Sequence, residues 1–228
     1  MRAPGRRDPV VTIDGPAGAG KSTVARGLAR RLGWNLVSTG ALYRALAWAV
    51  REAGVNVDEP DALRKILDRT DVRLADERVL VDGRDVTAFI RTPEISELTS
   101  VLTKQRAVRD KMTPLQRALA ARGGVVLEGR DTGSVVWPEA EVKFYLDADL
   151  ETRARRRQAD LRAQGVDMDL AAVRADVASR DLQDMGRALA PLVRPEGAVI
   201  VDSTTLTLDE VVDVMARTVE QAWCCTGS

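Results

Sequence analysis

The residues with the clearest chemistry lie near the N-terminus, where several glycines precede a lysine and a serine. Residues 15–22 match the phosphate-binding pattern G-x-x-x-x-G-K-[ST] at every position. Glycines let backbone N–H groups curl around a β-phosphate, and the start of a helix adds a partial positive charge. Lys21 can reach the β- and γ-phosphates, and Ser22 can ligate Mg²⁺. The pattern therefore predicts an ATP-binding loop formed by Gly15, Pro16, Ala17, Gly18, Ala19, Gly20, Lys21, Ser22 and Thr23.

A second polar segment follows an apolar run that suits a buried strand. This segment, residues 128–133, reads Glu-Gly-Arg-Asp-Thr-Gly, so Arg130 and Asp131 lie between glycines at the end of the strand. A phosphate acceptor is already ionised and needs cations beside it, and the planar fork of an arginine suits a phosphate group. The position of this charged pair favours a functional role over a structural one.

Two more groups of charged residues lie between Leu150 and Arg187, a helical stretch broken by Gly165. Their spacing places the members of each group on one helix face. On spacing alone, such a face is more typical of a solvated surface with salt bridges than of a binding site. The first group is Arg153, Arg156 and Arg157, and the second is Arg180, Asp184 and Arg187.

Composition excludes several kinds of chemistry. The chain has no histidine, which removes histidine-dependent nucleophilic catalysis and the commonest zinc sites. The two cysteines, Cys224 and Cys225, are adjacent and fit neither a zinc site nor a disulfide scaffold. Lys+Arg 34 balances Asp+Glu 34, so nucleic-acid and anionic-membrane partners are not expected. No signal or membrane-spanning segment is expected, and the predicted location is cytoplasmic.

Hydrophobic patterning predicts an α/β fold with a central parallel sheet, because strands alternate with helices along the chain. Ligands in such sheets gather at the carboxyl ends of the strands. Residues 58–92 differ and predict a small antiparallel insert with a short helix at 60–68, strands at 72–74 and 79–81, and a tight turn at Asp82-Gly83. The other strands are expected at 10–13, 35–37, 125–127, 142–146 and 198–201, and the other helices at 22–32, 40–53, 93–103, 106–122, 150–187 and from 207.

Three segments that follow the phosphate-binding loop carry a resemblance to a known family. They are Ser38-Thr39-Gly40-Ala41-Leu42-Tyr43-Arg44, the segment 128–133, and Arg180 to Ala188 leading into Ala190-Pro191-Leu192. In this order they resemble the bacterial cytidylate kinases, which are nucleoside monophosphate kinases with a P-loop. The resemblance runs from about Val10 to the last helix. Glu128 departs from the Asp that the family often has, and the segment between Asp181 and Arg187 is less charged than in some members.

The resemblance implies a reaction and a domain organisation. The protein is expected to phosphorylate CMP and dCMP with Mg²⁺ and ATP, within a P-loop NTPase-type three-layer fold. One nucleoside monophosphate kinase domain would span residues 1–228. Its core would comprise about 9–37, 104–149 and 191–228, its monophosphate-binding lobe about 38–103, and its arginine-rich helical lid about 150–190.

The resemblance also implies site residues, which we transfer position by position. Thr39, Arg44 and Arg130 would contact the acceptor phosphate, and Ser100, Arg109 and Asp131 would read the cytosine. Arg180, Asp184 and Arg187 would hold the sugar and phosphates, and Arg153, Arg156 and Arg157 would lie beside ATP. The roles of Ser100 and Arg109 rest wholly on the resemblance. The residues expected to take part in transfer itself are Lys21, Arg130, Asp131, Arg153, Arg157 and Arg180.

Two alternatives remain open at this point. One is a P-loop kinase for another small acceptor, such as UMP, AMP or shikimate. The other is a nucleotide-regulated P-loop binding protein, although the chain lacks the Asn-Lys-x-Asp guanine-reading motif of GTPase switches. The expected partners are ATP and CMP or dCMP, and the expected oligomeric state is a monomer.

Overall fold

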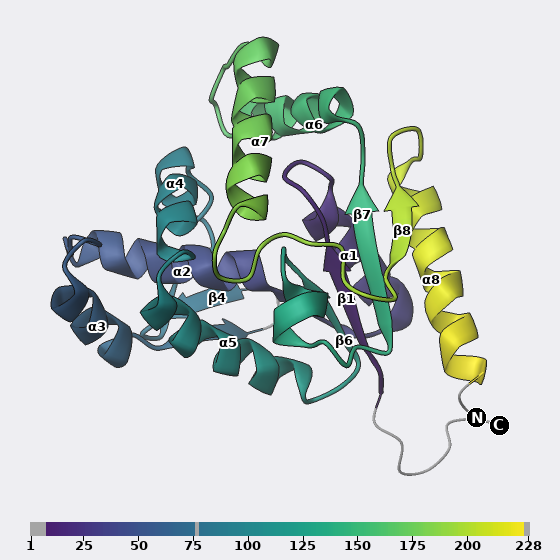
Figure 1. The fold of residues 1–228 in the computed structure, drawn as a ribbon, viewed down its shortest axis with the longest axis horizontal. Coiled ribbons are helices and arrows are strands. Elements are labelled where there is room, and N and C mark those ends of the chain that lie inside the picture. The colour runs from purple at the N-terminus through teal and green to yellow at the C-terminus, as the bar shows by residue number, and fades with distance from the viewer. Residues whose placement is uncertain (1–7, 76–77, 226–228) are drawn as a thin grey trace. The chain divides into compact units, whose positions relative to one another are not determined.

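The computed structural model of the protein describes residues 8–75 and 78–225. The side chains of Cys224 and Cys225, and residues Asp76 and Glu77 between two of the expected strands, lie outside this description. Contacts within the chain divide it into two compact units (Figure 1). The first unit comprises Met1–Leu36 and Arg122–Ser228, and the second comprises Val37–Ala121.

The first unit is built around a parallel sheet with the strand order β2-β6-β1-β7-β8. These strands are β1 (Val10–Asp14), β2 (Asn35–Ser38), β6 (Val125–Glu128), β7 (Val142–Asp147) and β8 (Val199–Asp202). The central strand β1 pairs in parallel with β6 and β7, and β7 pairs in parallel with β8. Every residue of β1 is buried, as expected of a strand whose two faces are both covered. The predicted α/β fold with a central parallel sheet is confirmed.

Two apolar clusters organise the helices of the first unit. The larger cluster joins the sheet to α1 (Lys21–Leu32) and α8 (Leu208–Cys225), with Leu28, Phe144 and Met215 among its fully buried members. The smaller cluster joins α6 (Leu150–Ala163) to α7 (Leu170–Met185), which lie beside each other in Figure 1. It also includes Ala17 of the phosphate-binding loop. The methyl group of Ala17 therefore anchors that loop to the two helices.

Helix ends follow from local side-chain chemistry. Thr207 and Glu210 form a capping box before α8. The Glu210 carboxylate accepts from the Thr207 N–H at 2.8 Å, and the Thr207 hydroxyl accepts from the Glu210 N–H at 3.3 Å. The helix α7 ends at Met185, with Gly186 as its C-cap. This corrects the expectation that Arg180, Asp184 and Arg187 share one helix face, because Arg187 lies beyond the end of the helix.

The second unit combines helices with a small antiparallel sheet. Its strands are β3 (Val72–Ala75), β4 (Arg78–Val81) and β5 (Arg84–Asp85), and its helices are α2 (Thr39–Glu52), α3 (Pro60–Arg69), α4 (Pro93–Leu102) and α5 (Arg106–Ala120). The strand β5 was not predicted, since two residues are too short for a pattern. Asp82 and Gly83 both have positive φ, as the expected tight turn requires. The helix α5 groups with this unit, whereas the expected boundaries placed it in the core.

Among the described residues, the helices are all too short or too polar to span a lipid bilayer.

Candidate active site

The phosphate-binding loop connects β1 to α1, as its pattern predicts. Gly15 has a φ of 150°, and a Cβ there would lie 2.0 Å from the Leu146 carbonyl oxygen of the neighbouring strand β7. Only glycine fits that close approach. The Thr23 and Val24 N–H groups donate to the Gly20 carbonyl, which begins the first turn of α1. The loop therefore leads directly into the N-terminus of a helix, where a phosphate binds best.

Lys21 is buried in this loop, with 6% of its surface exposed. Its ammonium group donates to the Pro16 carbonyl at 2.6 Å. Burial, together with the nearby Arg130 charge, lowers the pKa of Lys21 to about 7, although the charges of Glu128, Asp184 and Asp14 oppose the change. Lys21 is thus only partly protonated near neutral pH, and an anionic phosphate beside it would favour its protonated form.

Ser22 and Glu128 bring oxygen atoms together at the start of α1. The Ser22 hydroxyl donates to Glu128 Oε1 at 3.1 Å, and Glu128 is buried at the end of β6. A hydroxyl beside a carboxylate is the oxygen donor set that Mg²⁺ takes when phosphates supply further ligands. The residues present therefore fit a magnesium ion, with Ser22 as predicted and Glu128 as a residue to which the sequence assigned no role.

Asp14, the last residue of β1, holds the segment that follows Asp131. Its carboxylate accepts from the Thr132 N–H at 2.8 Å, the Thr132 hydroxyl at 2.7 Å and the Gly133 N–H at 2.7 Å. Burial raises the pKa of Asp14 to about 6, because these hydrogen bonds only partly offset desolvation and the Asp131 charge adds to it. Asp14 thereby fixes the π-helical turn η1 (Thr132–Val136) and the position of Asp131 before it.

Gly133 is required where this turn packs against the end of β1. A Cβ at this position would lie 2.7 Å from the Thr12 hydroxyl and 3.2 Å from Asp14 Oδ2. Asp131, which is also buried, caps the turn from the N-terminal side with a φ of −141°. The predicted polar loop is therefore a packed turn with a defined path.

Arg130 and Arg187 meet at the carboxylate of Asp184. Arg130 Nε donates to Asp184 Oδ2 at 2.7 Å, and Arg187 pairs with Asp184 Oδ1. Burial favours the neutral carboxyl, but the two guanidinium groups outweigh it and keep the pKa of Asp184 below its usual range. Arg180 lies one turn earlier on α7, where burial and the Arg130 charge lower its pKa. The structure thus brings together four residues predicted for the acceptor: Arg130, Arg180, Asp184 and Arg187.

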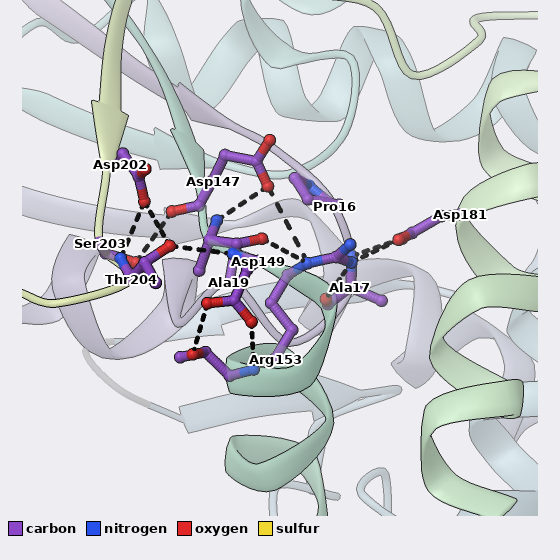
Figure 2. Close-up of polar contacts among 12 residues, drawn as sticks. Pro16, Ala17, Ala19, Asp147, Asp149, Arg153, Asp181, Asp202, Ser203 and Thr204 are labelled. Carbon is purple, nitrogen blue, oxygen red and sulfur yellow. Dashed lines mark hydrogen bonds and ion pairs between the residues drawn. The ribbon is translucent and has the colours of Figure 1, made fainter. Parts of the chain in front are cut away.

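Arg153 extends from α6 to the phosphate-binding loop (Figure 2), and Arg156 of the same helix also reaches this loop. Arg153 Nη1 donates to the Ala17 carbonyl at 3.1 Å and pairs with Asp181, while Nε donates to the Ala148 carbonyl at 2.9 Å. Arg156 donates to the Ser203 hydroxyl at 2.9 Å and the Ser203 carbonyl at 2.7 Å, with a longer contact of 3.4 Å to the Ala19 carbonyl. Both guanidinium groups therefore hold the loop by its backbone. Arg157 follows on the same helix and is half-buried.

In the second unit, Thr39 and Arg44 lie on α2. Thr39 is the first residue of that helix and is buried, and Ser38 is the N-cap, since its hydroxyl accepts from the Ala41 N–H at 3.2 Å. The Arg44 guanidinium packs over Gly40, whose missing side chain leaves room for it. The two predicted acceptor residues thus occupy the first turns of one helix.

Ser100 and Arg109 come together at the junction of α4 and α5. Arg109 is buried, and its Nε donates to the Thr103 carbonyl at 2.8 Å. The Thr103 hydroxyl in turn donates to the Ser100 carbonyl at 3.1 Å, and the Ser100 hydroxyl donates to the Ser96 carbonyl at 3.3 Å. Thr103 therefore links Ser100 to Arg109. The resemblance assigned both residues to the base, although no sequence motif connects them.

Four residues of the first unit were missed by reasoning from the sequence: Asp14, Glu128, Asp181 and Ser203. Asp14 and Glu128 each end a buried strand beside a glycine, which is a signal that sequence alone could have used. Asp181 stands next to Arg180, and its contacts are to residues about 30 and 160 positions away, at Arg153 and Ala17. Ser203 follows the last strand with no pattern around it. Only the folded chain reveals the roles of these last two.

Comparisons with known proteins agree with this geometry. The family model for cytidylate kinase matches residues 11–221. A cytidylate kinase from Symbiobacterium thermophilum is 46% identical over 218 residues, which cover 93% of this chain and 96% of that protein. One from Geobacter sulfurreducens is 46% identical over 225 residues, covering 97% of each chain.

Solved structures support the fold alone. An uncharacterized protein from Eubacterium ventriosum has a TM-score of 0.53 at 11% identity, with 93% of this chain and 99% of that chain covered. A shikimate kinase from Bacteroides thetaiotaomicron has a TM-score of 0.50 at 13% identity, with 93% and 98% covered. Taken with the phosphate-binding loop and the arginines around Asp184, the family match and the two relatives show that the chain belongs to the cytidylate kinase family.

Proposed function

We propose that this kinase transfers the γ-phosphoryl group of Mg·ATP to the phosphate of CMP or dCMP, forming CDP or dCDP. The observation that carries the proposal is the set of charges around the P-loop. Lys21, with Ser22 and Glu128, lies close to Arg130, and Arg130 is paired with Asp184. Phosphoryl transfer depends mainly on positioning and on neutralising phosphate charge, and these residues supply both.

The donor side consists of residues 15–23. Their backbone N–H groups would bind the β-phosphate, and Lys21 would exchange the Pro16 carbonyl for the β- and γ-phosphates. Ser22 and Glu128 would hold Mg²⁺, directly or through water. The ion, when bound, would neutralise charge on the β- and γ-oxygens. Because the acceptor is an ionised phosphate, the reaction needs no strong general base, consistent with a chain that lacks histidine.

The acceptor side rests first on arginines of the first unit. Arg130, Arg180 and Arg187 would bind the acceptor phosphate and sugar, with Asp184 orienting two of these guanidinium groups. Thr39 and Arg44 would add contacts to the same phosphate. Arginine suits this task because its donors can engage two phosphate oxygens at once.

Base selection would rest on Ser100, Arg109 and Asp131. A carboxylate can accept from the N4 amino group of cytosine, and a guanidinium can donate to N3 and O2. Uracil reverses the hydrogen-bonding polarity at two of these positions, which would leave buried groups unpaired. UMP is therefore expected to be the poorer acceptor.

The arginines of α6 would act on the donor side in two ways. Arg153 and Arg156 are engaged with the P-loop backbone, so we assign them to holding that loop in shape. Arg157 would approach the transferring phosphoryl when the segment 150–190 closes and excludes water. The division of the chain into core, lobe and lid is part of this proposal.

A coupled ADP-release assay tests the reaction. Mg·ATP is supplied with CMP, dCMP, UMP, AMP or shikimate in turn, using the wild type and Lys21→Ala. We expect fast turnover with CMP and dCMP, little with the others, and a loss of about 10³-fold or more in Lys21→Ala. Exposed Lys104→Ala is the matched control and should behave as the wild type. Turnover with a different acceptor would refute the base-reading roles of Ser100, Arg109 and Asp131.

The remaining expectations are also proposals. The protein is proposed to act as a monomer in the cytoplasm on small molecules. The balance of charges along the chain fits the proposed absence of nucleic-acid and membrane partners. Light scattering after size-exclusion chromatography tests the monomer, and a mass near 24.8 kDa is expected.

A further inference from the structure

One buried ion pair binds both the backbone N–H and the backbone carbonyl of Ala17. The Ala17 N–H donates to Asp181 Oδ1 at 3.0 Å, and the Ala17 carbonyl accepts from Arg153 at 3.1 Å. Arg153 and Asp181 also pair directly, and each is about nine-tenths buried. We refer to these contacts among Ala17, Arg153 and Asp181 as the Ala17 clamp (Figure 2).

The clamp acts on the middle of the P-loop. Ala17 lies between Gly15 and the run Gly18–Ser22, whose N–H groups are proposed to bind phosphate. A carboxylate beside a phosphate site is unfavourable unless a cation offsets it, and Arg153 supplies that charge. By binding the Ala17 N–H, Asp181 fixes the direction of the loop just before its phosphate-binding part. Its carboxylate thus contacts the loop without occupying the phosphate site.

The helix that carries Asp181 also carries residues of the acceptor side. Asp184 lies three positions further along α7, a spacing that places it on the same face as Asp181. Asp184 binds Arg130 and Arg187, and its backbone carbonyl accepts from the Leu192 N–H at 2.8 Å. A single rigid helix therefore contacts the P-loop through Asp181 and the acceptor arginines through Asp184.

We propose that Asp181 is a positioning residue that couples the acceptor site to the P-loop. An acceptor phosphate at Arg130 and Arg187 would change their contacts with Asp184 and shift α7. Through Asp181, that shift would reach the Ala17 peptide and favour the loop shape that binds ATP. The coupling rests on the proposed function, because it assumes that Arg130 and Arg187 bind the acceptor phosphate. By reciprocity, bound ATP would tighten the binding of CMP by the same factor.

Isothermal titration calorimetry tests the coupling through the affinity for Mg·AMP-PNP, with and without saturating CMP. In the wild type we expect CMP to tighten this binding about fivefold or more. Asp181→Asn keeps an oxygen for the Ala17 N–H but turns an amide toward Arg153, so the factor should fall to about one. Exposed Asp160→Asn on α6 makes the same charge change outside the clamp and should keep the wild-type factor.

The outcomes separate the coupling from the proposed function. A folded Asp181→Asn protein with the wild-type factor would overturn the role of Asp181. A wild-type factor of one, together with CMP turnover, would overturn the coupling and leave the kinase activity intact. Failure of the wild type to bind CMP would refute both.

A second variant covers the case in which Asp181→Asn does not fold. Arg153→Lys keeps a cation for Asp181 but cannot also bridge the Ala17 and Ala148 carbonyls, so its factor should fall as well. An unchanged factor in Arg153→Lys would contradict the clamp. Far-UV circular dichroism confirms the fold of each variant at the temperature of the titration.

Discussion

Two groups of arginines in the first unit have different partners. Arg153 and Arg156 donate mainly to backbone carbonyls of the P-loop and of the residues around it. Arg130 and Arg187 instead share one carboxylate, that of Asp184. All four were expected to contact nucleotide. The structure divides them into arginines that shape a phosphate site and arginines that can bind its ligand.

The two groups differ in which hydrogen-bond partners would become unpaired if the guanidinium group moved. If Arg153 moved, buried carbonyls and the Asp181 carboxylate would lose their partner, which is costly in a site with little water. If Arg130 moved toward a phosphate, Asp184 would keep Arg187, and Arg130 would exchange one anion for another. Arg130 can therefore turn toward a substrate phosphate because its partner Asp184 has a second cation in Arg187.

The largest effect is expected for Arg130, which shares the Asp184 carboxylate with Arg187. Arg130→Met should lower kcat/KM for CMP about 10³-fold, because a phosphate-binding guanidinium is lost. The free energy of unfolding should change by less than about 1 kcal/mol, since Arg187 still pairs with Asp184. Steady-state kinetics and urea unfolding measure the two quantities. The exposed Arg155→Met is the control, and a kinetic loss in Arg130→Met no greater than in this control would break the comparison.

A smaller effect is expected for the arginines that hold the loop. Arg153→Met should lower the free energy of unfolding by about 3 kcal/mol, because Asp181 would remain buried without its cation. Urea unfolding followed by circular dichroism measures this loss. In the control Arg155→Met, which removes only an exposed pair with Glu151, the change should stay below about 0.5 kcal/mol. Equal stability of the two variants would show that Arg153 does not hold the loop.

The smallest effect concerns the pH dependence of ATP binding. The pKa of Lys21 is lowered to about 7, so Lys21 loses its proton as the pH rises above 7. A neutral amine binds phosphate poorly, and the affinity for Mg·AMP-PNP should therefore fall about tenfold between pH 6 and pH 8. Asp14, with a pKa of about 6, gains charge in the lower part of this range and acts in the opposite direction by favouring protonated Lys21.

Proton uptake sharpens this measurement. Titrations at pH 7 in buffers of different ionisation enthalpy should show that about half a proton is taken up on binding, because the phosphates return Lys21 to its charged form. In Lys21→Met the uptake should vanish. Uptake that persists in that variant would assign the titration to another group.

Much of the fold could be predicted because its signals are local. The strand Val10–Asp14, the helix Lys21–Leu32 and the capping box at Thr207 and Glu210 each follow from a short pattern. The two-residue strand Arg84–Asp85 and the end of α7 at Met185 were not predicted, because a short strand and a helix end without a positive-φ glycine leave no periodic signal.

Site residues could be predicted only where they belong to a short sequence motif or to the family resemblance. The P-loop pattern pointed to Lys21 and Ser22. The family resemblance, which the family model confirms, pointed to Ser100 and Arg109, and the roles of all four residues stay predictions. Spacing could not distinguish Arg153 from Arg157, because both lie on one helix and their difference is set by Asp181 and Ala17. Contacts across such sequence distances depend on the packing of α6 and α7 rather than on any local pattern.

The approach of Gly15 to the Leu146 carbonyl also bears on protein design. The first residue of the P-loop is restricted by the backbone of a neighbouring strand, and this restriction is separate from any contact with phosphate. A P-loop grafted onto another scaffold would therefore need an adjacent strand whose backbone approaches the first glycine as closely. Without such a strand, that position would no longer require glycine for this steric reason. The portable unit is the loop together with the backbone of β7, rather than an eight-residue motif.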